Sequence, residues 1–262
     1  MDILKKSMAP ITQKAWEEIN TTSKEIFESI LTARRFVDVE GPKGIDYPAV
    51  PTGKLYIPDK QKEDGVKYGV HKIIPMIESR ISFKLSVWEL DDIDRGARLP
   101  DLSALEEAAR KVARFEEEAI YYGLGEMKGL FNTTNQKKLR FPDDPEELLL
   151  VITEGIIRFR ELAIGGPYTL VVNSENWKKL SGHVRGYPLI KQLEGLLKGK
   201  ILLNPNIKEN FLVSERGGDF ILTLGQDLSI GYEHHYNDEV QLFFMESFAF
   251  QVIEPDAVIA IE

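Results

Sequence analysis

Residues 41–72 are the part of the sequence that most limits how this chain can fold. Glycine and proline interrupt the whole stretch, at Gly41, Pro42, Gly44, Pro48, Pro51, Gly53, Pro58, Gly65 and Gly69. The strand-like pieces between them, such as residues 54–57, are too short to bury a core of their own. We therefore predict a projecting arm or hairpin near residues 45–72, which becomes stable mainly when it lies on another surface.

An amphipathic helix is predicted before the arm. Its apolar residues recur with helical spacing after Pro10 and Thr12, and they are Trp16, Ile19, Phe27, Ile30 and Leu31. We expect this helix to continue to about Arg35, followed by a short strand over residues 36–40.

The segment 80–90 alternates as a long strand. Ile81, Phe83, Leu85 and Val87 share one face, whereas Trp88 falls among the polar side chains of the other. A tryptophan on a polar face indicates a contact with protein, an interface or a stacked ligand, and we favour contact with protein.

Two further helices have clear start signals. Ser103 and Glu106 form a capping-box pattern, and the helix that follows should end near residue 122, before Gly123. Asp144 and Pro145 begin another helix, which should stop before Gly165.

Strands and helices alternate over residues 167–225. Strands are predicted at residues 168–172, 201–203, 211–213 and 220–224, with helices at 174–177 and 189–197. Residues 240–253 alternate strictly, which favours one long, bent strand. Together these patterns predict a mixed α+β chain in which the C-terminal strands return to the N-terminal elements.

Charge and cysteine content narrow the class of protein. The 33 Lys and Arg residues against 42 Asp and Glu residues give a net charge of −9, which argues against a dedicated nucleic-acid binder. The chain has no cysteine, which suits a reducing cytosol. The N-terminus lacks the apolar core of a signal peptide, and no run approaches the roughly 20 apolar residues of a membrane span. We expect a soluble, cytoplasmic protein that does not bind membranes.

No catalytic or metal-binding pattern emerges from the sequence. His234 and His235 are adjacent, so in a strand they would point to opposite faces and could not easily share one ion. A hairpin turn at Asn237 and Asp238 is the favoured interpretation of that region. Carboxylate runs such as residues 116–118 are interpreted as solvated faces. Phosphate-loop and nucleophile-elbow motifs are absent, so we predict neither an enzyme nor a metal site.

Several ordered segments resemble the encapsulin shell proteins, also called the linocin-like family. The matching segments are residues 36–42, 88–91, 95–96, 103–115, 166–171 and 214–233. The resemblance implies the tailed-phage major capsid protein fold (Hong Kong ninety-seven type), which has a peripheral domain, an axial domain and an extended loop. The boundaries it implies are 1–44 for the N-terminal helix and start of the peripheral domain, 45–72 for the extended loop, 73–129 for the peripheral domain with its spine helix, 130–225 for the axial domain and 226–262 for peripheral strands. Within the tract 214–233, the first half should form a hairpin of the axial domain, and residues 227–231 should return to the inner wall.

The same resemblance implies a self-assembling icosahedral shell, built from a multiple of sixty subunits, that encloses a cargo enzyme. Such cargo is typically a ferritin-like protein or a dye-decolourising peroxidase, which docks through a short C-terminal peptide. The residues implied on the two sides of the peptide pocket are Phe27, Leu31, Arg34, Asp38, Val39, Asp227, Ile230 and Gly231. Arg34 and Asp38 would fix the register of the peptide. The alternative is that Phe27, Leu31 and Ile230 are simply core residues.

Two further sites follow from the resemblance. The axial tip at the five-fold pore would comprise Ser181, Gly182, His183, Val184, Arg185, Gly186 and Tyr187. Some family members carry a flavin, FMN, which implies a possible site at Trp88 near Arg80, although interface packing explains Trp88 equally well.

Two other functional classes remain to be weighed. A phage or prophage major capsid protein that packages DNA would share the fold, and the acidic charge balance weakly disfavours it. A secreted bacteriocin or protease conflicts with the missing signal peptide and with the absence of a catalytic constellation.

Overall fold

A long sheet forms the centre of the computed structural model, which describes residues 3–61, 65–181 and 188–262. Its strand order is β1-β8-β9-β4, with β1 at Asp38–Glu40, β8 at Phe220–Tyr236, β9 at Glu239–Val252 and β4 at Ile77–Ser86. β8 and β9 make one antiparallel hairpin along the whole sheet, and Asn237 turns the chain with a φ of 50°. The predicted turn at Asn237 and the long C-terminal strand are both confirmed.

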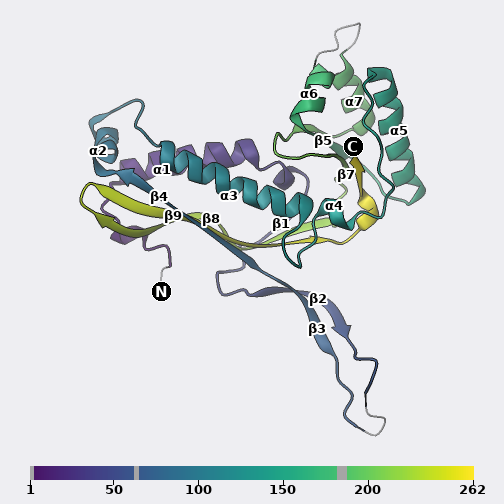
Figure 1. The fold of residues 1–262 in the computed structure, drawn as a ribbon, viewed down its shortest axis with the longest axis horizontal. Coiled ribbons are helices and arrows are strands. Elements are labelled where there is room, and N and C mark those ends of the chain that lie inside the picture. The colour runs from purple at the N-terminus through teal and green to yellow at the C-terminus, as the bar shows by residue number, and fades with distance from the viewer. Residues whose placement is uncertain (1–2, 62–64, 182–187) are drawn as a thin grey trace.

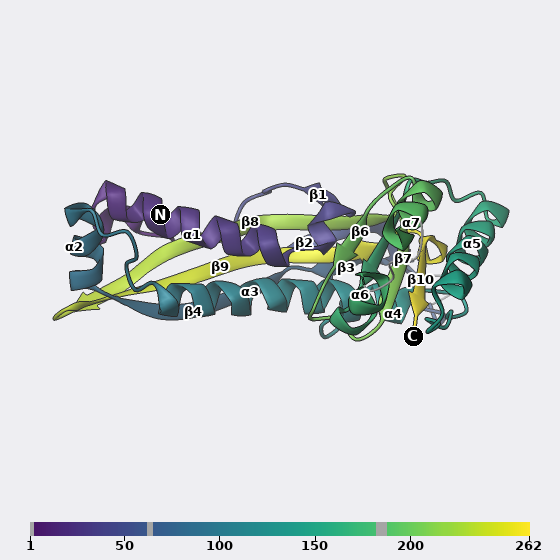
Figure 2. The same cartoon turned by 90° about the horizontal axis from the view of Figure 1, so that it is seen from above.

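Two helices lie side by side along one face of this sheet (Figures 1 and 2). α1 spans Gln13–Ile30 and α3 spans Ser103–Tyr122. α1 ends five residues before the expected Arg35, because Leu31 leaves the helical conformation and the short helix η2, Ala33–Arg35, follows it. A short N-terminal helix, η1 at Lys6–Met8, precedes α1.

α3 begins at the predicted residue but by another mechanism. The capping box of Ser103 and Glu106 does not form, and the Ser103 amide instead donates to Asp101 Oδ1 at 3.0 Å. The helix ends at Tyr122 as predicted. Gly123 follows with a φ of 86°, and a Cβ there would lie 2.6 Å from the Met127 carbonyl oxygen.

The strand predicted over residues 80–90 is wrong at its C-terminal end. β4 stops at Ser86, and helix α2 occupies Val87–Arg95. The Val87 amide donates to the Asp238 carbonyl at 2.7 Å, and Leu90 and Ile93 are buried one turn apart on the helix. Trp88 therefore stands in the first turn of a helix, 62% exposed, and not on the polar face of a strand.

A second, shorter sheet lies beyond one end of the long sheet (Figure 1). Its order is β10-β7-β5-β6, with β5 at Tyr168–Val172, β6 at Ile201–Leu203, β7 at Asn210–Ser214 and β10 at Val258–Ile261. The helices around it are α5 at Pro145–Glu161, α6 at Ser174–Ser181 and α7 at Leu189–Leu197, and α4, Leu130–Thr133, lies near the end of α3. α6 runs four residues past its predicted end at Trp177.

Two segments lie in a different sheet from the one expected. β10 falls in the range assigned to peripheral strands, but η3, Pro255–Ala257, turns the chain and β10 pairs with β7 of the short sheet. Residues 220–225, expected in an axial hairpin, instead begin β8 in the long sheet. The positive φ angles of Gly217 and Gly218 make the turn just before it.

The predicted arm is a two-stranded hairpin that projects away from both sheets (Figure 1). β2, Ala49–Tyr56, pairs antiparallel with β3, Val70–Pro75. Most of its side chains are exposed, and the exposed large apolar ones are Leu55, Tyr56, Ile57, Val66, Tyr68, Val70 and Ile73. None of the arm residues that the structure describes is a buried member of either apolar core.

Two apolar cores hold the rest of the described chain together. One lies between the long sheet and helices α1, α2 and α3, and the stacked rings of Phe83 and Phe244 are part of it. The other spans the short sheet and the end of α3, where Tyr121 packs against Phe211. Among the described residues, no helix is both long and apolar enough to cross a membrane.

Candidate functional site

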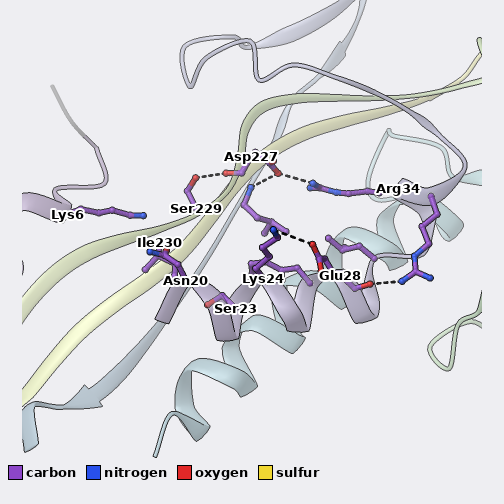
Figure 3. A pocket seen from close by; sticks show the side chains of 13 residues that line it. Lys6, Asn20, Ser23, Lys24, Glu28, Arg34, Asp227, Ser229 and Ile230 are labelled. Atoms are coloured by element: carbon purple, nitrogen blue, oxygen red, sulfur yellow. Dashed lines mark hydrogen bonds and ion pairs between the residues drawn. The ribbon is translucent and has the colours of Figure 1, made fainter. Parts of the chain in front are cut away.

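A groove of about 710 Å³ opens between α1 and β8 (Figure 3). Five of the residues predicted for the peptide pocket line it, namely Phe27, Leu31, Arg34, Asp227 and Ile230. The other lining residues are Lys6, Asn20, Ser23, Lys24, Glu28, Arg35, Leu228 and Ser229. The structure thus brings the N-terminal helix and the tract 214–233 together around one concave site.

The apolar side of the groove is part of the core beneath it. Leu31 and Ile230 are buried, and the half-buried ring of Phe27 meets Phe244 edge-on with ring centres 5.4 Å apart. Leu31 and Ile230 are therefore buried like core residues. Both still contribute to the wall of the groove.

A bulge in β8 forms the opposite wall. The pairing with β9 shifts between Gln226 and Ser229, which places Asp227 and Leu228 outside the regular ladder. Asp227 Oδ1 accepts the Leu228 amide at 2.8 Å, and the Ser229 hydroxyl donates to the Asp227 carbonyl at 2.7 Å (Figure 3). These bonds fix a local shape that no periodic pattern in the sequence reveals.

Arg34 is held by three carboxylates behind the groove. Its Nε and Nη2 donate to Glu116 at 2.8 and 2.6 Å, and Nη2 also donates to Glu246 at 2.6 Å. Nη1 donates to Asp227 Oδ1 at 2.9 Å. Burial alone would lower the pKa of Arg34, but its hydrogen bonds to Glu116 and the surrounding negative charges raise it, so Arg34 is a permanent cation.

Two of the three carboxylates are fully buried. Glu116 and Glu246 are each 0% exposed. The reading of residues 116–118 as a solvated face is therefore wrong for Glu116 and for Glu117, which is 1% exposed, and holds for the exposed Glu118. Burial raises the pKa of Glu246 well above its usual value, and the charge of Glu116 adds to the rise. Oε2 of Glu246 has no hydrogen-bond partner in the described structure. Arg34 therefore holds the Asp227 bulge in place, and most of its donors are already used.

Three residues predicted for the pocket do not line the groove. Asp38 accepts the Gly218 amide at 2.5 Å, and Val39 pairs with Leu222 in β1. Gly231 lies opposite Phe243, where a Cβ would come within 2.1 Å of the phenylalanine ring. Their roles are backbone pairing and close packing.

Sequence reasoning missed Asn20 and Lys24, although a signal for them exists. Asn20, Lys24 and Phe27 are spaced by four and three residues, which places them on one face of α1, and Leu31 follows four residues later, just past the end of the helix. Lys24 forms an ion pair with Glu28 at 3.7 Å on the exposed rim of the groove.

The family described as "Encapsulating protein for peroxidase" matches residues 1–249 of this sequence. The chain belongs to this family. A type 1 encapsulin shell protein from Rhodococcus erythropolis is 36% identical over 100% of both chains. Another, from Mycolicibacterium paratuberculosis, is 35% identical over 99% of this chain and 98% of its own length. A ferritin-like-encapsulin shell fusion protein from Pyrococcus furiosus is 24% identical over 76% of this chain and 56% of its own.

Solved structures confirm the encapsulin fold class. A virus-like particle from Pyrococcus furiosus aligns with a TM-score of 0.67 at 20% identity, covering 94% of this chain and 98% of its own. The capsid of Myoviridae phage XM1 aligns with a TM-score of 0.60 at 13% identity, covering 88% and 91%. The expected α+β capsid fold is confirmed. The non-catalytic role agrees with relatives that are themselves named shell proteins.

The encapsulin resemblance also implied a pore loop at residues 181–187 and a possible flavin site at Arg80 and Trp88. Ser181 ends α6, whereas Gly182, His183, Val184, Arg185, Gly186 and Tyr187 lie outside the described residues. The Arg80 guanidinium lies 3.6 Å from the centre of the Phe243 ring and pairs with Glu233 at 3.7 Å. Trp88 stands beyond the end of β4, and Ser86 is six steps along the strand from Arg80, a distance of about 20 Å. Arg80 and Trp88 of one chain therefore do not fit a common flavin site.

The histidine pair also has a structural explanation. The Tyr232 hydroxyl and His235 Nδ1 are 2.5 Å apart, beside the turn of the β8–β9 hairpin. Across the part of the chain that the structure describes, no group of three or more His, Cys, Asp or Glu residues could hold a metal ion.

Proposed function

We propose that this chain closes into an icosahedral protein shell and that the groove between α1 and β8 holds a peptide of the enclosed cargo. Membership of the encapsulin shell family and the capsid fold support the shell. The groove is the one observation that carries the docking proposal, because it combines an apolar wall with a polar rim at the position that the resemblance implied.

The shape of the subunit supports assembly in a closed shell. The arm exposes apolar side chains that neither core covers, so a neighbouring subunit is the natural surface for them. Closed symmetry lets copies of one self-complementary chain build the whole container, with a multiple of sixty subunits. The absence of cysteine suits assembly in a reducing cytoplasm.

The proposed cargo is a peroxidase or a ferritin-like protein. The family description names a peroxidase, and the Pyrococcus furiosus relative carries a ferritin-like part in its name. Peptide binding of this kind uses apolar side chains for affinity and polar groups for register. In this groove the apolar surface comes from Phe27, Leu31 and Leu228, and the polar rim includes Lys24 and Asp227.

Co-expression tests the docking proposal. A fluorescent protein would carry the C-terminal peptide of a candidate ferritin-like or peroxidase cargo, and its co-purification with the shells would be measured. Leu228→Asp should abolish loading, because it places a charge on the apolar wall, while the shells still form. Leu162→Asp makes the same change at an exposed residue outside the groove and should load normally. Equal loading in the two variants would refute docking in this groove.

A DNA-packaging capsid is the second candidate, because the phage capsid shares the fold. The ratio of absorbance at the nucleic-acid and protein bands of purified shells separates the two functions. Shells of the proposed type carry no nucleic acid beyond background.

Flavin binding is a separate hypothesis, which rests on Trp88 alone because Arg80 does not reach it. A visible absorbance spectrum of purified shells would detect FMN, and Trp88→Ala should remove that absorbance if the flavin stacks there.

A further inference from the structure

Glu117 lies at the place where three separate parts of the chain meet. It is 1% exposed on α3, beside the end of α1 and beside the loop that joins β6 to β7. The long-sheet layer and the short sheet therefore contact each other through this side chain.

The hydrogen bonds of Glu117 come from both neighbouring segments. Oε1 accepts the Ala33 amide at 2.8 Å, and Oε2 accepts the Thr32 hydroxyl at 2.5 Å. Asn204 Nδ2 donates to Oε2 at 2.7 Å and to Thr32 Oγ1 at 2.9 Å. The Tyr121 hydroxyl lies 2.9 Å from Thr32 Oγ1 and completes the cluster.

Asn204 connects this cluster firmly to the short sheet. Its backbone amide donates to the Val172 carbonyl of β5 at 2.9 Å. Its Oδ1 accepts the Asn206 amide at 2.9 Å, which fixes the amide group so that Nδ2 faces Glu117. A change at Glu117 thus acts directly on the anchoring of the β6–β7 loop.

Glu117 differs from its neighbour Glu116 in having no cationic partner. Glu116 shares two hydrogen bonds with Arg34, whereas the partners of Glu117 are a hydroxyl, a backbone amide and a side-chain amide. The titratable and charged groups around it are Glu116, Glu118, Arg114, Tyr121 and Tyr122 from α3, Arg34 and Arg35 from η2, and Lys208 and Glu209 from the β6–β7 loop. Arg114, Glu118 and Lys208 line a cavity of about 460 Å³ next to it.

The cluster can accommodate both protonation states of the carboxyl. When Glu117 is ionised, Thr32, Ala33 and Asn204 all donate to it, and Tyr121 donates to Thr32. When Glu117 is protonated, it donates to Thr32 Oγ1, and the Thr32 hydroxyl turns toward Tyr121. In the protonated form the Tyr121 hydroxyl no longer donates to Thr32, which is a small loss. Protonation also removes a charge without a cationic partner from a buried site that already contains Glu116, which is a gain.

We propose that Glu117 is a proton-controlled contact that binds α3, the end of α1 and the short sheet together more firmly when protonated than when ionised. Burial raises the pKa of Glu117 from 4.5 to about 7; the hydrogen bonds from Thr32 and Ala33 offset part of this rise, and the charge of Glu116 adds to it. The folded chain therefore binds this proton more tightly than the unfolded chain does. The contribution to stability is full below about pH 4.5 and is lost as the pH rises through about 7.

Thermal unfolding of purified shells as a function of pH tests this proposal. The unfolding midpoint of Glu117→Gln should lose the part of its pH dependence that lies between about pH 4.5 and about pH 7, because glutamine does not titrate. Glu118→Gln, the same change at the exposed neighbouring residue, should keep the dependence of the unaltered chain. Identical pH profiles for Glu117→Gln and Glu118→Gln would overturn the proposal.

A second variant keeps the proposal testable if Glu117→Gln does not assemble. Tyr121→Phe leaves the carboxyl in place but removes the donor that supports its ionised form through Thr32. The infrared band of protonated carboxyls should then titrate at a higher pH than in the unaltered shell. A band that titrates at the same pH in both proteins would contradict a role for the Tyr121–Thr32–Glu117 chain. The contribution of Glu246 to this band is identified with Glu246→Gln.

Discussion

Arg34 and Glu116 are joined by two parallel hydrogen bonds, from Nε to Oε1 at 2.8 Å and from Nη2 to Oε2 at 2.6 Å. Such a bidentate pair fixes the plane of the guanidinium as well as its position. Because the same guanidinium also donates to Asp227, the pair determines where the wall of the groove stands. Arg34 therefore fixes the shape of the groove through hydrogen bonds to carboxyl groups of its own chain.

Arg34→Ala should destabilise the fold and not only weaken docking. It would leave the buried carboxylate of Glu116 without its cation and remove the donor that bonds buried Glu246, and breaking a buried pair from one side costs about 3 kcal/mol or more. Chemical denaturation of the variant measures this loss. Arg35→Ala is the matched control, since the Arg35 side chain donates to the exposed Glu28 carbonyl, and the loss of stability should be below about 1 kcal/mol. Equal stabilities of the two variants would contradict a structural role for Arg34.

Glu246→Gln should gain stability relative to the unaltered chain as the pH rises. Burial raises the pKa of Glu246, so its carboxyl stabilises the fold fully only in acid and loses that contribution as the pH increases. Glutamine keeps an oxygen for Arg34 Nη2 and carries no charge. Free energies of unfolding measured at acidic and alkaline pH check this. In acid the free energies of the two proteins should differ by about 1 kcal/mol or less. A disadvantage of the variant that grows with pH would be the opposite of the expected result.

Gly231→Ala should destabilise the long sheet by about 1–3 kcal/mol through overpacking. The new Cβ would come within 2.1 Å of the Phe243 ring, and the Arg80 guanidinium covers that ring at 3.6 Å. Gly195→Ala is the control, because nothing lies within 4 Å of a Cβ there and residue 195 lies inside α7. It should be neutral or should stabilise by about 1 kcal/mol through better helix propensity. Equal denaturation midpoints in both variants would show that β8 can move away from β9 at this point.

Replacing both Tyr56 and Ile57 with serine should block shell assembly and leave the subunit folded. Both side chains are exposed on the arm, and neither belongs to an apolar core. Size-exclusion chromatography and electron microscopy would report assembly, and circular dichroism would report the fold. Leu162→Ser is the control. It also removes an exposed apolar side chain, but from the end of α5 and not from the arm. Intact shells with a serine-substituted arm would show that the arm does not mediate assembly.

Local patterns predicted the elements whose signals are strong and continuous. The glycines and prolines of residues 41–72 indicated the arm, and the alternation of residues 240–253 indicated β9. The boundary at Ser86 was missed because Val87 continues the strand alternation, while the contact that starts α2 comes from Asp238, far along the chain. β10 was missed for a similar reason, since only pairing with β7 identifies it.

The elements that form the groove could be predicted from the sequence, but the burial of the acids behind it could not. The resemblance brought α1 and residues 227–230 together, and the helical spacing of Asn20, Lys24 and Phe27 could have added to that list. Nothing in the run Glu116, Glu117 and Glu118 distinguishes two buried acids from one exposed acid. Their burial depends on Arg34, Thr32 and Asn204, which reach them from distant parts of the chain.

The segment that follows α1, residues 31–34, should tolerate neither insertions nor deletions. Thr32 and Ala33 contact Glu117 and Arg34 contacts Glu116 without a spare residue between them, so inserting or deleting one codon there would shift these partners away from the buried acids that they bond. The described residues of the arm have no such register with buried side chains of either core. Length variation among relatives should therefore collect in the arm and be excluded from residues 31–34.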